Sequence, residues 1–277
     1  MELSIKHKTK YEYVNPIGNL IQTTKLYPSE NNALKIINWN VTRDAAKKSK
    51  IYTDGEGNNI QNFSNRNMVK NINFTVNGKV ETFDTKGVYK NPLDKINPLV
   101  YLRSTSLTES DSEIIELGKD AKNGISDNIK ISHKLLKLVA ERVEYKPLTT
   151  SNETSAIIAY KQRKGVCQDQ AHIMIAAARS LGIPARYVNG YMHNNSHNSE
   201  YQSTHAWAEF YIENLGWVGF DSTNNCSPDE RYIRVSCGLD ANYAAPIKGV
   251  FYGNNNLNGL IENLEISVQT LEYNSQQ

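Results

Sequence analysis

One segment in the second half of the 277-residue chain constrains the fold more than any other: GVCQDQAHIMIAAARSLGIPARYVNGY, residues 165–191. Its small and apolar residues recur with the period of an α-helix, and Gly182 and Pro184 end that pattern. The run ARYVNGYM that follows is typical of a strand. Cys167 therefore lies in the first turn of the predicted helix. The residues that keep the helical period are Ala171, Met174, Ile175, Ala178 and Leu181.

A pair of strands is predicted shortly after this helix. HAWAEFYIE alternates between its two faces, ENLG is a turn, and WVGFD returns. If the turn is centred near residues 213–216, the antiparallel ladder places His205 opposite a residue in 221–224. Asp221 then lies within reach of the histidine at the open end of the hairpin. The side chains expected on one face of the first strand are Ala206, Ala208, Phe210 and Ile212.

Cys167, His205 and Asp221 have the chemistry of a thiol enzyme. Only the thiolate of a cysteine attacks a carbonyl, and a helix N-terminus favours the thiolate by lowering the thiol pKa. Backbone amides at the same helix end can face the oxyanion that forms on the attacked carbonyl. A carboxylate beside a histidine fixes its tautomer and stabilises the imidazolium. A free cysteine taken alone is more often a buried structural thiol, so the pattern of three residues is what favours catalysis.

The first part of the chain, residues 1–105, is predicted to be an antiparallel β-sandwich. LSIKHKTKYEYV alternates between apolar and polar residues, and several short strands follow it. In KNINFTVNGKVETFDT, Asn77 and Gly78 lie between two alternating runs. That arrangement predicts a β-hairpin with its turn at these two residues.

Two helices are predicted between the β-region and the cysteine. NIKISHKLLKLVAERVEY has an apolar face, and Pro147 is expected to stop it. TSAIIAYKQRKG is the second helix, with Thr154 as its N-cap and Gly165 just past its end.

These patterns divide the rest of the chain into three further parts. Residues 106–126 are polar and are predicted to be a linker with a short helix. Residues 127–253 form the predicted catalytic core, in which the helix that carries the cysteine packs on an antiparallel sheet. Residues 254–277 are predicted to be a polar tail with one strand-like piece, LEISVQTLEY.

The sequence resembles the transglutaminase-like superfamily, a relative of the papain-type thiol enzymes. Three blocks occur in the family's order: a Cys at a helix start, a His before Ala-Trp, and an Asp before Thr-Asn-Asn. HKTKYEYVNPI and YTDGEGNNIQNF resemble the N-terminal β-domain of the bacterial members, and VSCGLDANYAAPIKGVFYG resembles their C-terminal block. The resemblance covers the chain up to about residue 253. It implies an α+β fold, with an N-terminal antiparallel β-sandwich followed by a papain-like core.

The resemblance also implies a role for individual residues. Cys167 would be the nucleophile, His205 the general base and acid, and Asp221 the residue that orients the histidine. Trp207 would shield or wall the cleft. The residues implied to support the three are Gln168, Asp169, His172 and Trp207.

The chain departs from the family's pattern in two places. Asp221-Ser-Thr stands where the family usually has Asp-Pro-Thr, which leaves the three catalytic positions intact. Gly238-Leu-Asp stands where Gly-Arg-Asp is usual, so a positive charge is absent and substrate binding is expected to differ.

Structural explanations compete for several of these residues. Inside a helix, His172 is by default a core histidine, and Asp169 in the first turn complements the helix dipole. Trp207, on a strand, is more often part of a core than of a substrate site. Cys226 and Cys237 are interpreted as small core residues or surface thiols, with a disulfide disfavoured.

No metal, cofactor, nucleic acid or membrane is expected to be a partner. His193 and His197 have metal-like spacing but no zinc pattern around them, and a solvated loop explains them better. The net charge of +2 gives no basic surplus for nucleic acid or anionic membranes. Since no signal peptide or membrane span is visible, a cytoplasmic location is expected.

The predicted reaction is acyl transfer from an amide of a protein or peptide substrate through a thioester. Hydrolysis by water, as in a peptidase or amidase, is the first hypothesis. Transfer to an amine, as in a protein-glutamine gamma-glutamyltransferase, is the second. A binding module that kept the fold without catalysis is the third.

Overall fold

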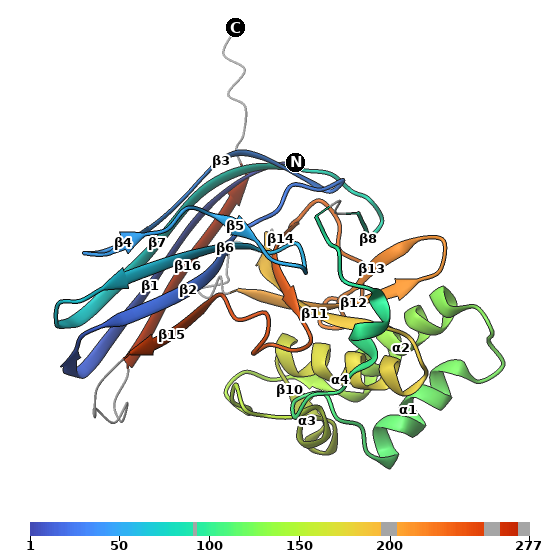
Figure 1. Ribbon diagram of the computed structural model, residues 1–277. Helices are drawn as coiled ribbons and strands as arrows, with labels where there is room; N and C mark the ends of the chain where they lie inside the picture. The colour runs from blue at the N-terminus through green and yellow to red at the C-terminus, as the bar shows by residue number, and fades with distance from the viewer. Residues whose placement is uncertain (91–92, 195–203, 252–260, 271–277) are drawn as a thin grey trace, which may run out of the picture.

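Two antiparallel sheets and a third sheet covered by helices form the two halves of the molecule (Figure 1). The computed structural model describes residues 1–90, 93–194, 204–251 and 261–270. Mixed helices and strands of this kind confirm the predicted α+β fold class.

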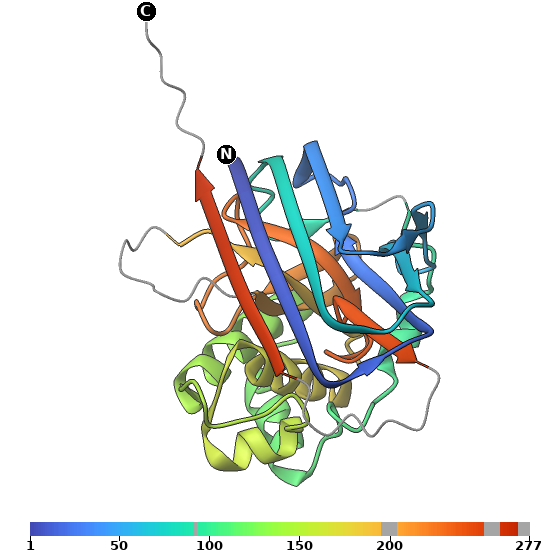
Figure 2. The same ribbon diagram turned by 90° about the vertical axis from the view of Figure 1, so that its left-hand side faces the viewer.

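The first sheet has the strand order β16-β1-β7-β3 and lies face-on in Figure 2. The second sheet has the order β15-β2-β6-β4, and β5 pairs with β6. Apolar residues from both sheets form one buried cluster, which includes Ile17, Leu20, Val41, Phe63 and Phe74. The strands of these sheets are β1 (Glu2–Ile17), β2 (Leu20–Tyr27), β3 (Leu34–Arg43), β4 (Lys47–Lys48), β5 (Tyr52–Thr53), β6 (Asn59–Asn65), β7 (Val69–Thr82), β15 (Ile247–Phe251) and β16 (Ile261–Thr270).

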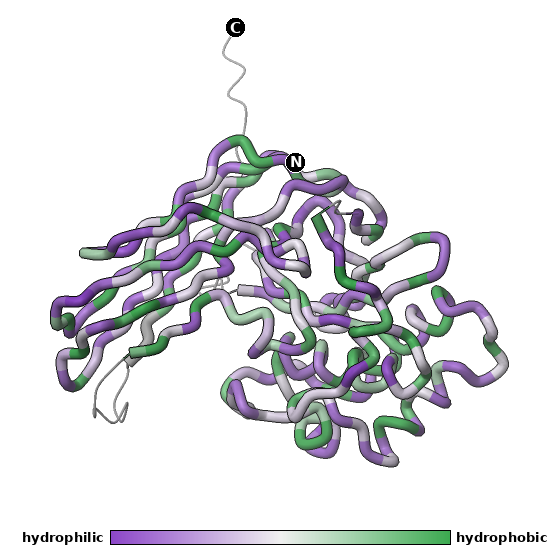
Figure 3. The backbone as a smooth tube through the Cα atoms, in the orientation of Figure 1, coloured by the Kyte–Doolittle hydropathy of each residue, from purple (hydrophilic) through white to green (hydrophobic). Residues whose placement is uncertain are grey.

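The alternation of β1 explains how the first sheet is covered. Leu3 and Ile5 are buried, whereas Lys6 and Lys8 are exposed on the opposite face. Hydrophilic and hydrophobic residues alternate in the same way along the neighbouring strands (Figure 3). A period of two of this kind places one face of a strand against a core and the other in water.

The predicted hairpin at Asn77 and Gly78 is wrong. These residues lie inside β7, which runs unbroken from Val69 to Thr82, and Gly78 pairs with Trp39 on β3. A Cβ atom on Gly78 would lie 2.2 Å from the Trp39 ring. The glycine therefore makes room for an indole from another strand and does not form a turn.

The C-terminal strands return to the N-terminal sheets. β15 pairs with β2, and β16 pairs with β1 along ten residue pairs from Leu3↔Thr270 to Glu12↔Ile261. The predicted division of the chain at residues 105, 126 and 253 stays a prediction, but strand pairing crosses it at β15 and β16.

The third sheet has the order β14-β11-β12-β13-β8 and supports the helices. Helix α4 packs on the face of β12 that carries Ala206, Ala208 and Phe210, as the alternation predicted. The elements of this half are β8 (Val88–Tyr89), η1 (Pro98–Leu102), α1 (Ser112–Lys122), α2 (Asn128–Arg142), β9 (Glu144–Tyr145), α3 (Ala156–Gln162), β10 (Lys164–Gly165), α4 (Cys167–Ser180), β11 (Ala185–Met192), β12 (His205–Ile212), β13 (Gly216–Phe220) and β14 (Tyr232–Gly238).

The helix ends correct three details of the sequence analysis. α2 ends at Arg142, well before Pro147. The N-cap of α3 is Ser155, whose side chain accepts a hydrogen bond from a backbone N–H of the first turn, and not Thr154. α3 ends on Arg163 in the left-handed conformation, so Gly165 does not cap it.

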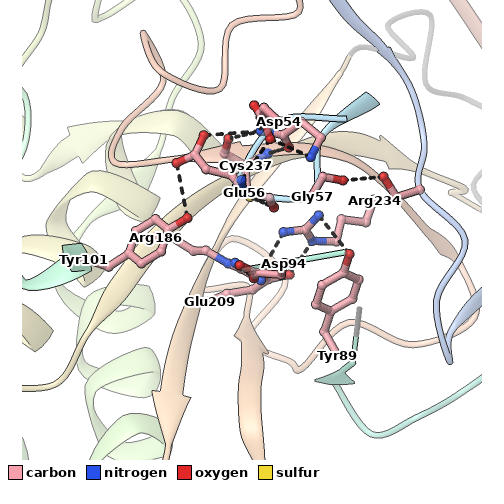
Figure 4. Close-up of polar contacts among 12 residues, drawn as sticks. Asp54, Glu56, Gly57, Tyr89, Asp94, Tyr101, Arg186, Glu209, Arg234 and Cys237 are labelled. Atoms are coloured by element: carbon pink, nitrogen blue, oxygen red, sulfur yellow. Dashed lines mark hydrogen bonds and ion pairs between the residues drawn. The ribbon is translucent and has the colours of Figure 1, made fainter. Parts of the chain in front are cut away.

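A buried ionic cluster occupies the other face of the third sheet (Figure 4). Glu209 on β12 accepts hydrogen bonds from Arg186 Nε at 2.7 Å and Arg234 Nε at 2.8 Å. Asp94 also contacts Arg186, whose side chain is 0% exposed. Opposite charges in this cluster are paired, which is the condition under which charges can be buried.

Candidate functional site

Cys167 is the first residue of α4, and two local interactions fix this helix start. The Asp169 carboxylate accepts hydrogen bonds from the Val166 backbone N–H at 2.8 Å and from the Thr150 hydroxyl at 2.6 Å. A Cβ atom on Gly165 would lie 2.6 Å from the Asp169 side chain. Asp169 is therefore a capping residue for the turn that presents the thiol.

His205 and Asp221 are brought together by the hairpin of β12 and β13. The ladder pairs Ile212 with Gly216 and Ala208 with Phe220, a register that leads His205 toward residue 223. His205 Nε2 lies 2.6 Å from Asp221 Oδ2, and both side chains are buried. The predicted juxtaposition of these two residues is confirmed.

The Asp221 carboxylate is held by several donors besides the histidine. Oδ2 accepts from Asn224 Nδ2 and from the Tyr232 hydroxyl, each at 2.7 Å, and Oδ1 accepts from the Thr223 backbone N–H at 3.0 Å. Burial raises the pKa of Asp221, but the hydrogen bonds and the charge of His205 outweigh it and lower the pKa. Asp221 is therefore a carboxylate across the neutral pH range.

The protonation of His205 follows from its two neighbours. Burial lowers its pKa, whereas hydrogen bonds to Asp221 and Cys167 and the charges of both raise it, to about 10. Because Nε2 is taken by Asp221, Nδ1 is the ring nitrogen left for the thiol. An imidazolium here stabilises a negative charge on the sulfur of Cys167.

Cys167 and His205 open onto a cleft with a volume of about 880 Å³. Two strands of the first sheet form one side of it: β1 contributes His7, Thr9 and Tyr11, and β16 contributes Leu264. The other described lining residues are Tyr145, Leu148, Asn152, Val166, Gln168, Tyr187, Asn189, Thr204, Ala206, Ala241, Asn242, Ala244, Ala245, Pro246 and Ile247.

The residues expected to support the thiol lie in different surroundings. Gln168 lines the cleft beside Cys167. His172 is fully buried, and its Nε2 accepts a hydrogen bond from the Ala241 backbone N–H at 3.1 Å. Burial lowers the pKa of His172 to about 4, so this core histidine is neutral.

The placement of Trp207 differs from the expectation that it walls the cleft. It is 2% exposed and is not among the described residues that line the cleft. Its ring packs against His205, with ring centroids 6.1 Å apart, and edge-on against Tyr232. Trp207 lies two residues after His205 on β12, so the two side chains share one face of the strand and Trp207 packs beside the histidine.

Sequence reasoning missed three residues near the site. Asn224 and Tyr232 bind the Asp221 carboxylate, and Gln170 donates to the Val143 carbonyl at 2.8 Å and accepts from the Thr223 hydroxyl at 2.9 Å. Asn224 follows Asp221 by three residues, a spacing that predicts a turn with side-chain hydrogen bonds. Tyr232 lies on β14, and no local sequence pattern indicates that it contacts Asp221.

The remaining titratable groups give no metal site in the part of the chain that the structure describes. Cys167, Cys226 and Cys237 are all free thiols. His193 is buried, with Nδ1 3.3 Å from the Val268 carbonyl oxygen, and His197 lies outside the described residues. No described helix is both long and apolar enough to cross a bilayer. The cytoplasmic location stays a prediction.

Fold and site together define a chain with a cysteine at a helix start beside a buried histidine–aspartate pair. Residues 115–222 match the transglutaminase-like superfamily, and residues 3–81 match the bacterial transglutaminase-like N-terminal region. Residues 115–222 therefore belong to the transglutaminase-like superfamily, and residues 3–81 correspond to the N-terminal region of its bacterial members.

One relative and one solved structure extend this likeness over nearly the whole chain. An uncharacterized protein of Mycobacterium leprae is 28% identical over 266 residues, which are 91% of this chain and 93% of the relative. A protein-glutamine gamma-glutamyltransferase of Pseudomonas aeruginosa is 24% identical over 147 residues, 46% of this chain and 22% of the relative. The crystal structure of a candidate cysteine protease from Cytophaga hutchinsonii superimposes with a TM-score of 0.76 and 20% identity. That superposition covers 98% of this chain and 91% of the other, and it shows a shared fold.

Proposed function

We propose that the protein is a cysteine-dependent acyl-transfer enzyme that cleaves amide bonds through a thioester, with water as its usual acceptor. One observation carries the proposal: Cys167 at the start of α4 shares a cleft with His205, and His205 is held at 2.6 Å by the buried Asp221 carboxylate. This is the arrangement of a nucleophile, a base and an orienting carboxylate.

In the first half of the reaction, the Cys167 thiolate attacks the amide carbonyl and a carbon–sulfur bond forms. The carbon–nitrogen bond then breaks, and the imidazolium of His205 gives its proton to the departing amine. In the second half, neutral His205 takes a proton from water as the oxygen attacks the thioester. The carbon–sulfur bond breaks and the carboxylic acid is released. The thiolate of Cys167 and the imidazolium of His205 are then regenerated.

Asp221 acts on this sequence through His205. Its carboxylate favours the imidazolium that exists before the first step and again after the second. Asn224 and Tyr232 hold the carboxylate in place and stay outside the reacting atoms.

Transfer to an amine is the second candidate, and the match to the Pseudomonas aeruginosa protein-glutamine gamma-glutamyltransferase favours it. Hydrolysis is preferred because a structural likeness over 98% of this chain is to a candidate cysteine protease. The two reactions share the thioester and differ only in the acceptor.

The test uses p-nitrophenyl acetate, which acylates a reactive thiol without a natural substrate. We expect a burst of one equivalent of p-nitrophenol and an acetyl group on Cys167 by peptide mass spectrometry. The acetyl group should then be released as acetate, and added putrescine should capture little of it as an amide. Cys226→Ala is the matched control and should keep the burst. If Cys167 is not acylated faster than Cys226, the enzyme proposal is wrong and a binding module remains.

A further inference from the structure

The described residues that line the cleft beside Cys167 lack the charges that are common elsewhere in the chain. Charged residues make up 22% of the sequence. Among the described residues that line the cleft, none is an Asp, Glu, Lys or Arg. Apart from the proposed thiolate and imidazolium, the described surface that meets a substrate is therefore uncharged.

Strand β1 shows how the charges are sorted. His7, Thr9 and Tyr11 share one face and line the cleft, whereas Lys6 and Lys8 are exposed on the other face. The strand therefore directs neutral polar groups toward Cys167 and keeps its lysines in solvent. A strand of the N-terminal sheet thus forms one wall of the proposed active site.

His7 adds a polar group to this wall without adding a charge. Its Nδ1 lies 2.7 Å from the Tyr191 hydroxyl, and its Nε2 lies 2.8 Å from the Thr9 hydroxyl. Burial lowers the pKa of His7 to about 4, so the ring is neutral at physiological pH. With both nitrogens engaged, His7 is not a second base and instead orients Thr9.

The other walls combine amides with apolar side chains. Amide groups offer both donors and acceptors to a peptide backbone without a net charge. At the mouth, Leu148 is fully exposed and Leu264 is 45% exposed, although both are apolar. Exposed apolar residues around a cleft are typical of a binding surface. The amide side chains that line the cleft are those of Asn152, Gln168, Asn189 and Asn242.

We propose that this cleft binds an uncharged stretch of peptide around the attacked amide, and that β1 of the N-terminal sheet is its specificity wall. The inference rests on the proposed thiol chemistry at Cys167. A charged residue entering the cleft loses water and finds no opposite charge on the described walls, whereas an uncharged polar or apolar residue loses little.

The test measures how the charge of a small reagent changes its rate of reaction with Cys167. Three methanethiosulfonates are compared on the full chain: the neutral methyl reagent, the anionic sulfonatoethyl reagent and the cationic trimethylammonioethyl reagent. Each rate is divided by the rate with a short peptide that contains the Cys167 sequence. We expect the neutral reagent to exceed both charged reagents by about fivefold after this correction.

Charge variants then test the wall itself. Tyr11→Lys should raise the anionic-to-cationic rate ratio by about threefold, and Tyr11→Glu should lower it equally. Leu264→Lys and Leu264→Glu repeat the test at an exposed position, in case the Tyr11 variants fail to fold. Lys8→Glu on β1 and Gln269→Lys on β16 place the same kinds of charge change on the outward faces, and the ratio should stay as in the wild type.

The outcomes separate this inference from the proposed function. If the ratios of the Tyr11 and Leu264 variants match those of their outward controls, or if a charged reagent is preferred in the wild type, the neutral wall is wrong. That result would leave acylation of Cys167 by p-nitrophenyl acetate unaffected. If Cys167 is not acylated but the charge selectivity of the methanethiosulfonates is as expected, the proposed chemistry is wrong. The uncharged wall would then be part of a peptide-binding site.

Discussion

Two positions on the same face of one strand, β12, involve a buried carboxylate in different ways. At the start of β12, His205 is paired with Asp221 and opens onto the cleft. Four residues later on the same face, Glu209 is enclosed by two arginines, and the Arg186 side chain is 0% exposed (Figure 4). Trp207 lies between the two positions in the sequence.

The difference teaches what makes a buried charge available for chemistry. Burial raises the pKa of Glu209, but Arg234 and Arg186 outweigh it and lower the pKa, so the carboxylate is fixed by partners that do not titrate near neutrality. Asp221 is equally buried, but its partner is a histidine that can release a proton. The middle of the strand, at Glu209, is therefore suited to hold the fold together, and its start, at His205, is suited to move protons.

The largest effect is expected from Asp221→Asn. The amide cannot favour the imidazolium, so acylation of Cys167 by p-nitrophenyl acetate should fall by about 10²- to 10⁴-fold while the protein stays folded. Asp229→Asn removes a carboxylate that pairs with Arg231 at the surface, and it should leave the rate unchanged. Equal rates in the two variants would contradict the difference between the His205 and Glu209 positions of β12.

Glu209→Gln should show the reverse pattern, with stability lost and chemistry kept. Removing the carboxylate leaves the buried Arg234 guanidinium without its ion-pair partner and Arg186 with Asp94 alone, at a cost of about 3–5 kcal/mol in the free energy of unfolding. Urea unfolding measures this loss. The exposed Glu213→Gln, on the same hairpin, is the control and should change stability little. A Glu209 variant as stable as this control would mean that the ionic cluster does not hold the sheet.

Tyr232→Phe sharpens the account of how Asp221 is held. The hydroxyl donates to Asp221 at 2.7 Å and also contacts Cys226 Sγ at 3.3 Å. Losing a hydrogen bond to a charged group should slow acylation of Cys167 on the order of tenfold. Cys226→Ala keeps the bond to Asp221 and should react like the wild type. If acylation of Cys167 is also slow in Cys226→Ala, the effect of Tyr232→Phe comes from the lost contact with the Cys226 thiol instead.

The last effect concerns the pH dependence of stability. The folded-state pKa of His7 is about 4, below its ordinary value of 6.5, so the unfolded chain binds more protons between these values. The contribution of His7 is complete above pH 6.5 and is lost as the pH falls toward 4. His172 has the same low pKa and adds to the loss.

His7→Gln tests this contribution because glutamine can bond Tyr191 and Thr9 without titrating. Urea unfolding at pH 7 and pH 4.5 should show a drop in the wild type that is smaller in the variant by about 2 kcal/mol. An identical drop in both proteins would show that His7 does not contribute to the pH dependence of stability.

Local patterns predicted the parts of the site that depend on neighbouring residues. The start of α4 at Cys167 followed from helical period, and the approach of His205 to Asp221 followed from a short turn and an alternating ladder. Both features form within one helix or one hairpin, so the local sequence is enough to predict them.

Contacts between distant segments could not be predicted in this way. The Asn77-Gly78 pair looked like a turn because nothing nearby reveals that Trp39 packs over the glycine. Tyr232 reaches Asp221 from another strand, and β16 returns from the C-terminal part of the chain to pair with β1. The cleft wall on β1 appears only when these long-range pairings are known.

The most direct test of the central claim is the rate of iodoacetamide alkylation of each cysteine from pH 4 to 9. It is followed by peptide mass spectrometry in the wild type and in His205→Ala. Because His205 is protonated up to a pKa of about 10, we predict that Cys167 reacts rapidly well below pH 7 and that His205→Ala abolishes this reaction at low pH. Cys226 and Cys237 serve as internal references. If Cys167 responds to pH as these two do, or is unaffected by the loss of His205, the thiolate–imidazolium pair does not exist.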